Sequence, residues 1–175
     1  MKHILAASLL FISFALLADI LYQLANVKIM TISSSAFVNS QSIPAQFTCD
    51  GENISPPLNF IDVPSSSQSL ILIVDDPDAP GGTWLHWLVY NIDPTVKGLV
   101  QGEKPKGEEG VTSFGKLGYG GPCPPSNVHH YHFKLYALDQ RLTLPEKATL
   151  SQVQTAMKGH IVSQAEMIGL YSRSK

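Results

Sequence analysis

The 175-residue sequence has no marked excess of charge of either sign: 12 Lys and Arg residues stand against 14 Asp and Glu, a formal net charge of −2. Proteins that bind nucleic acid usually carry a basic surplus. No run of like charges indicates a disordered tail. We therefore expect one folded domain with no nucleic-acid partner.

The motifs of several enzyme classes are missing as well. The chain contains no GxSxG, no phosphate-binding P-loop and no GxGxxG. Its serine-rich stretches, 33–35 and 65–67, lie in loop-like sequence with no partner group in view. The sequence thus shows no nucleophile with an activating partner, so we expect no catalytic residues and no cofactor.

Cysteine is scarce: only Cys49 and Cys123 are present, without a CxxC motif that would indicate a zinc or thioredoxin-type site. In an oxidising compartment the two could pair and close a loop of roughly 75 residues. The alternative is two independent buried thiols. Both lie in turn-like sequence, FTCDGEN and GPCPP, where a covalent link is more useful than a core thiol. We take the pair as a candidate disulfide.

The longest apolar run lies at the N-terminus, over residues 4–18, after a short basic start. This pattern is typical of a secretory signal peptide, although neither Ala18 nor Ala25 completes an A-x-A cleavage site. Extended to Ala25, the run approaches the roughly 20 residues that span a bilayer. We expect residues 1–25 to be a signal peptide or a membrane anchor, with a buried helix as the third alternative. Either of the first two makes the domain at 26–175 exported: periplasmic, secreted or anchored.

Short apolar runs alternate with turn sequences along the rest of the chain. The run at 27–33 predicts a first strand. The run at 69–76 predicts a buried strand that ends in acids, and the run at 83–92 is apolar on both parities, as in a strand covered on both faces. Residues 131–138 alternate between apolar and polar, which predicts a half-exposed strand. These strands predict a mostly-β domain with a sandwich or Greek-key arrangement.

The C-terminal stretch changes period. Thr149 and Gln152 form a capping-box pattern, and Gly159 could divide the helical stretch in two. We expect a terminal helix or helix pair, because these apolar residues recur at helical spacing: Leu150, Val153, Met157, Ile161, Ala165 and Ile168.

Three carboxylates end the predicted strand at 69–76 or come directly after it: Asp75, Asp76 and Asp78. A buried strand that ends in acids places them at the edge of the core, where desolvation raises a carboxyl pKa unless a donor or cation compensates. The simpler interpretation is an Asx-Pro turn in which the acids bond their own backbone N–H groups.

His86 shares strand parity with Trp84, Leu88 and Tyr90, so its face is apolar or aromatic. A lone histidine on such a face is usually a core residue. The short APGG connection, however, could bring the acids beside it and form an Asp–His pair at the mouth of an apolar pocket. Such a pair would suit an anion or a polar head group.

Three further histidines lie close together: His129, His130 and His132. His130 and His132 share a strand face, which is workable metal-ligand geometry. Lys134 continues the same face, and a cation there disfavours a divalent ion. We favour a solvated strand face and expect no metal.

The stretches DPDAP, HW, GYGGPCPP and HHYHF, in this order, resemble the phosphatidylethanolamine-binding protein family, which includes the Raf kinase inhibitor proteins and plant flowering regulators. FTCDGENISPPL is similar to the bacterial and archaeal branch. The resemblance covers roughly residues 28 to 172. It implies an antiparallel β-sandwich with a C-terminal helix and a small pocket for anions and phosphorylated head groups.

Carried over residue by residue, the resemblance implies two pocket histidines, pocket-edge acids and a rigid proline wall. The family usually has Arg between His129 and Tyr131, where this chain has His130, so charge at the pocket rim would depend on pH. The implied ligand-binding residues are Asp76, Asp78, Ala79, Pro80, Trp84, His86, Tyr119, Pro124, Pro125, His129 and Tyr131.

These features together predict an exported, non-enzymatic protein that binds phosphate or a phospho-head-group and modulates a protein partner, a kinase or a protease. Membrane contact would be made only through the N-terminal segment, if it is retained. The alternative is a hydrolase that uses the Asp–His cluster as general acid and base or as metal ligands.

Overall fold

A computed structural model describes residues 28–173. The predicted signal peptide or anchor at 1–25 lies outside the described residues, so that prediction stays untested. In the part of the chain that is described, no helix is long and apolar enough to cross a bilayer.

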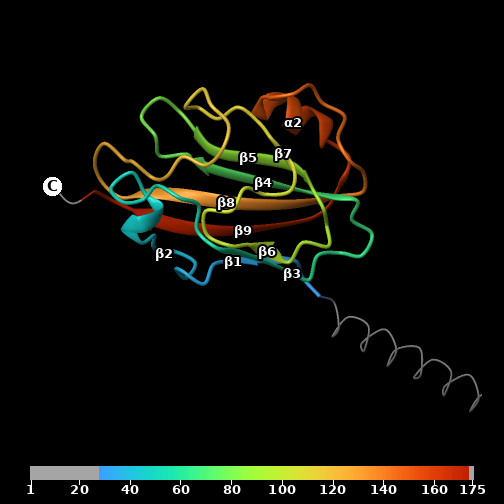
Figure 1. Ribbon diagram of the computed structural model, residues 1–175, viewed down its shortest axis with the longest axis horizontal. Helices are drawn as coiled ribbons and strands as arrows, with labels where there is room; N and C mark the ends of the chain where they lie inside the picture. Colours follow the sequence, from blue (N-terminus) through green and yellow to red (C-terminus); the bar gives the residue numbers. More distant parts are fainter. Residues whose placement is uncertain (1–27, 174–175) are drawn as a thin grey trace, which may run out of the picture.

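The fold is a mostly-β sandwich of two sheets, as predicted (Figure 1). The smaller sheet has the order β1-β3-β6 and the larger one β2-β9-β8-β4-β5-β7. All neighbouring strands are antiparallel except β2 and β9, which are parallel. The smaller sheet comprises β1 (Thr31–Ser33), β3 (Leu58–Ile61) and β6 (Gly98–Leu99). The larger one comprises β2 (Gln41–Ser42), β4 (Ser69–Asp76), β5 (Trp84–Ile92), β7 (Glu108–Glu109), β8 (His129–Leu138) and β9 (Ile161–Tyr171).

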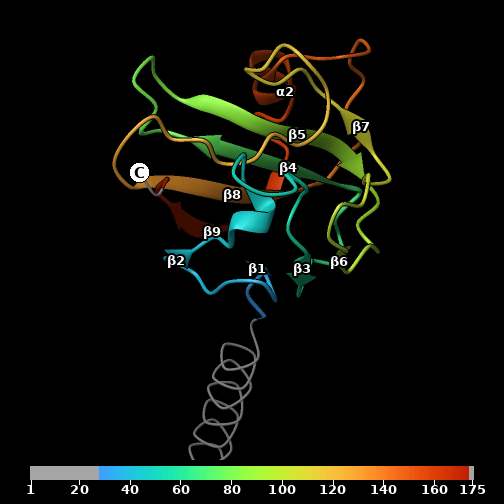
Figure 2. The same ribbon diagram turned by 60° about the vertical axis from the view of Figure 1, so that its left-hand side comes forward.

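The larger sheet is covered on both faces, which explains its apolar strands. The smaller sheet packs on one face, and the helix α2 (Leu150–Ala156) lies over the other (Figures 1 and 2). One apolar cluster fills the space between the sheets, and a second lies beneath α2. Every residue of β4 is buried. The predicted strands at 69–76 and 83–92 are confirmed, and their two-sided apolar sequence has its cause in these two cores.

Strand β8 alternates as its sequence predicts. The residues from His129 to Ala137 at odd positions are buried, and those at even positions are exposed or half-buried. It also begins two residues earlier than predicted, so His129 and His130 belong to the strand. The predicted first strand at 27–33 is shorter, since only 31–33 pair with β3.

The helix pair predicted for the C-terminus is wrong in its second half. Thr149 does cap α2, and its capping box with Gln152 is complete. Gly159, at φ 80°, then turns the chain, and residues 161–171 form β9, paired with β8 along its length. Helical spacing at Ile161, Ala165 and Ile168 is coincidental, because non-local pairing with β8 outweighs a local pattern.

A disulfide and a hydrogen bond connect the loop around Cys49 to the segment around Cys123. The 3-10 turn η1 (Ala45–Phe47) leads into Cys49, which forms a disulfide with Cys123, Sγ–Sγ 2.07 Å. The backbone N–H of Cys49 also donates to the carbonyl of Pro122 at 3.0 Å. The candidate disulfide is therefore present in the structure, and neither cysteine is a free thiol.

Reduction of this disulfide should lower stability considerably. The two cysteines are 74 residues apart, and closing a loop of that length stabilises a fold by about 4 kcal/mol through the unfolded state. We expect dithiothreitol to lower the Tm by on the order of 10 °C, measured by thermal unfolding. The double variant Cys49→Ser/Cys123→Ser should show the lower Tm and no response to reductant. An unchanged Tm of the native chain after complete reduction would contradict this.

Replacing Gly169 by Ala should also destabilise the sandwich. A Cβ at this position of β9 would lie 2.5 Å from Cγ1 of Ile43 and 2.8 Å from the ring of Phe37, in a packed core where added volume costs about 1–3 kcal/mol. The matched control is Gly81→Ala, because a Cβ there meets nothing within 4 Å. Urea unfolding should separate the two variants, and equal midpoints would refute the packing argument.

Candidate functional site

A cavity of about 220 Å³ opens at one end of the larger sheet, where β4 ends and β5 and β8 begin. The β4–β5 connection, in green, and the segment that leads into β8, in orange, lie together at this end in Figures 1 and 2. Its lining residues are Asp76, Ala79, Pro80, Trp84, His86, Phe114, Cys123, Pro124, Pro125, His129 and Tyr131.

The Asp76 carboxylate uses both of its oxygens. Oδ1 accepts a hydrogen bond from the backbone N–H of Asp78 at 2.9 Å, and Oδ2 accepts one from Nδ1 of His129 at 2.8 Å. Asp76 and His129 are only 3% and 6% exposed. The Asx-turn interpretation is therefore correct for this residue. The predicted pairing of the acids with His86 is wrong, because the histidine partner of Asp76 is His129.

His86 occupies a β-bulge. Leu85 pairs with Asp75 and Trp87 with Val74, which leaves His86 as the extra residue of β5. Bulges break the alternation of faces and redirect a side chain. Leu88 and Tyr90 accordingly belong to the cluster beneath α2, and the interpretation that His86 shares their face is wrong.

The His86 ring faces the pocket side instead. It lies edge-on to Tyr131, with ring centroids 5.2 Å apart, and to Phe114 at 5.4 Å. Its Nδ1 lies 2.6 Å from the carbonyl oxygen of Gly120. The backbone N–H of Gly120 in turn donates to the carbonyl of His86 at 3.0 Å. This reciprocal pair fixes the orientation of the ring.

The hydroxyl of Tyr131 has no hydrogen-bond partner within residues 28–173, although Tyr131 is only 1% exposed. Burial, and after it the negative charge of Asp76, raises the pKa of this hydroxyl. It therefore stays protonated across the ordinary pH range and can donate to a ligand in the pocket, where Asp76 and the backbone of Cys123 are its polar neighbours. Its ring also stacks on His129, with centroids 6.4 Å apart and an interplanar angle of 23°.

The GYGGPCPP stretch forms one wall and is attached to the loop around Cys49. Gly121 N–H donates to Oδ1 of Asn53 at 2.7 Å, beside the Cys49–Cys123 disulfide. A Cβ on Gly121 would lie 2.6 Å from the Phe47 carbonyl, so only glycine fits this approach. The prolines on either side of Cys123 restrict φ, which makes the wall rigid.

Two residues implied by the resemblance do not line the cavity. The Tyr119 hydroxyl donates to the Phe47 carbonyl at 2.8 Å, and its ring lines a neighbouring cavity beside Trp87. The Asp78 carboxylate accepts hydrogen bonds from the backbone N–H and Nδ1 of His130, at 2.8 and 2.7 Å, on the exposed side of the loop. These contacts lower the pKa of Asp78.

Two lining residues, Phe114 and Cys123, were not among those predicted to bind ligand. Cys123 was predicted only as a disulfide partner. Phe114 lies in VTSFGKL, a loop without a strand or turn pattern that points to the site, and it reaches the cavity through its edge-on contact with Trp84 at 5.5 Å. No sequence signal identifies it.

The three clustered histidines do not form one site. His129 is buried in the pocket, whereas His130 is half-exposed beside Asp78. Nδ1 of His132 bonds Glu166 at 2.8 Å on the outer face of the sheet. Within residues 28–173, no group of three potential ligands gathers to hold a metal ion.

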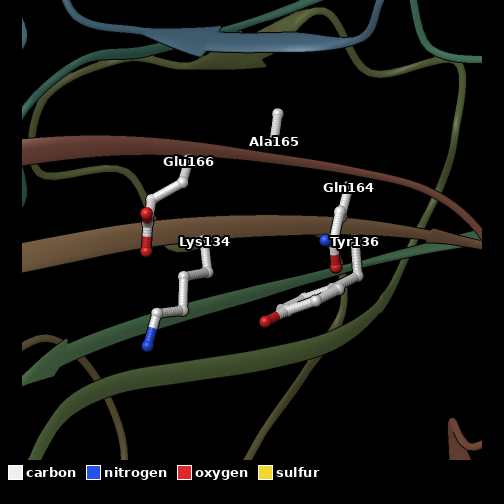
Figure 3. A pocket seen from close by; sticks show the side chains of 5 residues that line it. All are labelled: Lys134, Tyr136, Gln164, Ala165 and Glu166. Carbon is white, nitrogen blue, oxygen red and sulfur yellow. The ribbon is translucent and has the colours of Figure 1, made fainter.

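A shallow depression of about 240 Å³ on the outer face of β8 and β9 is the alternative location for a site. Figure 3 shows Lys134, Tyr136, Gln164 and Glu166 pointing to this side and Ala165 pointing away. Its charges are already paired, since Lys134 Nζ contacts both Asp75 oxygens at 2.7–2.8 Å and Glu166 pairs with His132. A ligand would therefore find fewer hydrogen-bonding groups without a partner here than in the pocket.

Comparison with known proteins identifies the family of this fold. Residues 33–172 match the family model of the phosphatidylethanolamine-binding proteins. A UPF0098 protein of Methanothermobacter thermautotrophicus is 49% identical over 150 residues, which cover 82% of this chain and 99% of that protein. One from Chlamydia pneumoniae is 45% identical and is covered completely, over 83% of this chain.

Two solved structures share the fold. A putative phosphatidylethanolamine-binding protein homologue from Chlamydia trachomatis superposes with a TM-score of 0.82 at 42% identity, covering 85% of this chain and all of that one. E. coli YbcL, described as a member of the mammalian PEBP family, gives 0.77 at 29% identity, with 84% and 100% covered. Since the family model spans most of the chain and these relatives match it nearly end to end, the chain belongs to the phosphatidylethanolamine-binding protein family.

Proposed function

We propose that this protein binds a small anionic or phosphorylated ligand in the pocket between His86 and His129. The observation that carries the proposal is the Tyr131 hydroxyl, which is buried and has no partner among the described residues. A buried polar group left without a hydrogen bond costs about 1–3 kcal/mol. An anionic oxygen beside it would accept that bond and recover this free energy.

The dimensions of the cavity favour a small head group. Its volume of about 220 Å³ is below the roughly 300–1,000 Å³ of sites for drug-sized ligands. At its rim, Trp84 and Phe114 are 39% and 40% exposed and contact each other edge to face. Their rings could cover the organic part of a ligand whose phosphate lies deeper, between the two histidines.

The rigidity of the wall favours binding over a mobile catalytic role. The disulfide, the prolines and the hydrogen bonds to the Cys49 loop hold the cavity open in one shape. A pre-formed site loses little conformational entropy when a ligand enters. The lining residues include no Ser, Thr or Lys, and the sulfur of Cys123 is oxidised, so we propose a binding protein and not an enzyme.

Phosphate should therefore stabilise the protein, and Tyr131→Phe should remove the effect. A ligand at 100 times its Kd adds about 2.7 kcal/mol, which corresponds to a Tm increase of about 5–10 °C. Tyr131→Phe keeps the ring, removes the unsatisfied hydroxyl and should leave the unliganded Tm unchanged or higher. His129→Ala should also abolish the shift.

Differential scanning fluorimetry with and without phosphate measures both quantities. His132→Gln on the outer face of β8 is the matched control, and it should keep the full shift because His132 contacts Glu166 and not the cavity. A full phosphate shift in both Tyr131→Phe and His129→Ala would refute the proposed site.

A hydrolase is the second candidate function, and the Asp76–His129 hydrogen bond favours it. A carboxylate that orients a histidine is the arrangement that general bases use, and water would be the nucleophile. Turnover of p-nitrophenyl phosphate by the purified protein, lost in Asp76→Asn, would establish this activity. We expect no turnover above the uncatalysed rate, and sustained turnover would replace the binding proposal.

A further inference from the structure

The contact between His86 and Gly120 determines which ring nitrogen of His86 carries the proton. Nδ1 lies 2.6 Å from the Gly120 carbonyl oxygen. A carbonyl oxygen only accepts hydrogen bonds, so Nδ1 carries the proton. In the neutral ring Nε2 then has a lone pair and no proton. Because His86 lines the cavity and Gly120 occupies Nδ1, Nε2 is the ring nitrogen left for a ligand.

The surroundings of His86 favour its neutral form. His86 is 3% exposed, and burial lowers its pKa, although the hydrogen bonds to the backbone of Gly120 and Gly121 and the charges of Asp76 and Asp75 on β4 oppose that shift. The Asp75 charge is paired with Lys134. At neutral pH, Nε2 therefore acts as a hydrogen-bond acceptor.

Other charged or titratable groups around the ring do not reverse this. From β8, Tyr131 faces it as a neutral hydroxyl, and His129 is bonded through Nδ1 to Asp76. Lys116 is exposed and does not line the cavity, and its Nζ lies 5.8 Å from the centroid of the Phe114 ring. The lining of the pocket thus combines a carboxylate with a neutral His86 and contains no Lys or Arg to compensate a dianion.

We propose that the pocket selects oxyanions that carry a proton, namely phosphomonoesters and inorganic phosphate, over sulfate and phosphodiesters. This rests on the proposed anion-binding function. The P–O–H group of the ligand donates to Nε2 of His86, while the Tyr131 hydroxyl donates to a deprotonated oxygen. Sulfate and phosphodiesters have no such proton at neutral pH. Binding them would leave two acceptors facing each other at Nε2 or would require a protonated His86, which burial disfavours. Sites built to accept a hydrogen bond reject analogues that lack the donor.

The selection is coupled to proton uptake. A phosphomonoester loses its second proton with a pKa of about 6, so above that pH the free ligand is mainly a dianion. Binding then requires one proton from solvent, which is shared between a ligand oxygen and Nε2 of His86. No covalent bond changes. The apparent affinity should fall about tenfold for each pH unit above the pKa of the ligand, since each unit lowers the protonated fraction tenfold.

Isothermal titration calorimetry of the full chain at pH 7 tests the selection with four probes: inorganic phosphate, phosphoethanolamine, sulfate and dimethyl phosphate. We expect the first two to bind at least tenfold more tightly than the last two. Phosphoethanolamine binding without inorganic phosphate binding would assign the ligand to a head group, and comparable affinities would assign it to the phosphoryl group alone. Equal affinity of phosphate and sulfate would overturn the inference but leave the anion-binding function standing. Failure of all four probes to bind would overturn both.

Proton uptake is measured by repeating the phosphoethanolamine titration at pH 8 in two buffers with different ionisation enthalpies. We expect close to one proton taken up per ligand, and none would overturn the inference. His86→Gln replaces the acceptor with an amide that can also donate, so it should reduce the preference for phosphate over sulfate to within threefold. His132→Gln makes the same substitution on the outer face and should keep the preference. If His86→Gln does not fold, the proton count in the native chain still decides.

Discussion

The buried hydrogen bond between Asp76 and His129 holds this site together. A carboxylate at 3% exposure is tolerated only when its oxygens have partners. One oxygen holds the turn that begins the loop with Ala79 and Pro80, and the other holds the first residue of β8. His129 in turn stacks on Tyr131. Two walls of the cavity thus depend on a single side chain at the end of the most buried strand.

The opposite wall is held by a different kind of constraint. The Gly120 carbonyl fixes His86 from a segment that is itself attached to the Cys49 loop by a disulfide and by Gly121. A covalent bond in the wall therefore helps to set the tautomer of a histidine in the pocket, because it limits how far the Gly120 carbonyl can move. The same loop also receives the end of β9, where the Tyr171 hydroxyl donates to Asp50 at 2.8 Å. One short segment thus connects the covalent link, the wall and the last strand.

Local patterns predicted the parts of this fold that local forces determine. Apolar runs covered on both faces identified β4 and β5, and a capping box identified α2. The bulge at His86 and the strand β9 could not be predicted this way, because register and pairing depend on neighbours far along the chain. Motif resemblance named most of the lining residues. It missed Phe114 and the lining position of Cys123, and it included Tyr119 and Asp78, whose polar groups are bonded elsewhere. That residues 1–25 direct export stays a prediction.

His130 stands where the resemblance implies an arginine, and its contacts with Asp78 do not depend on the charge of its ring. Its backbone N–H and Nδ1 both donate to one oxygen of Asp78. Nδ1 can donate in the neutral ring as well as in the charged one. The loop that carries Ala79 and Pro80 therefore remains attached to β8 whichever form His130 takes. The shape of the pocket at this rim position therefore does not depend on the charge of His130. In the proposed function, recognition of the anion therefore belongs to His86, and His130 attaches the loop at the rim.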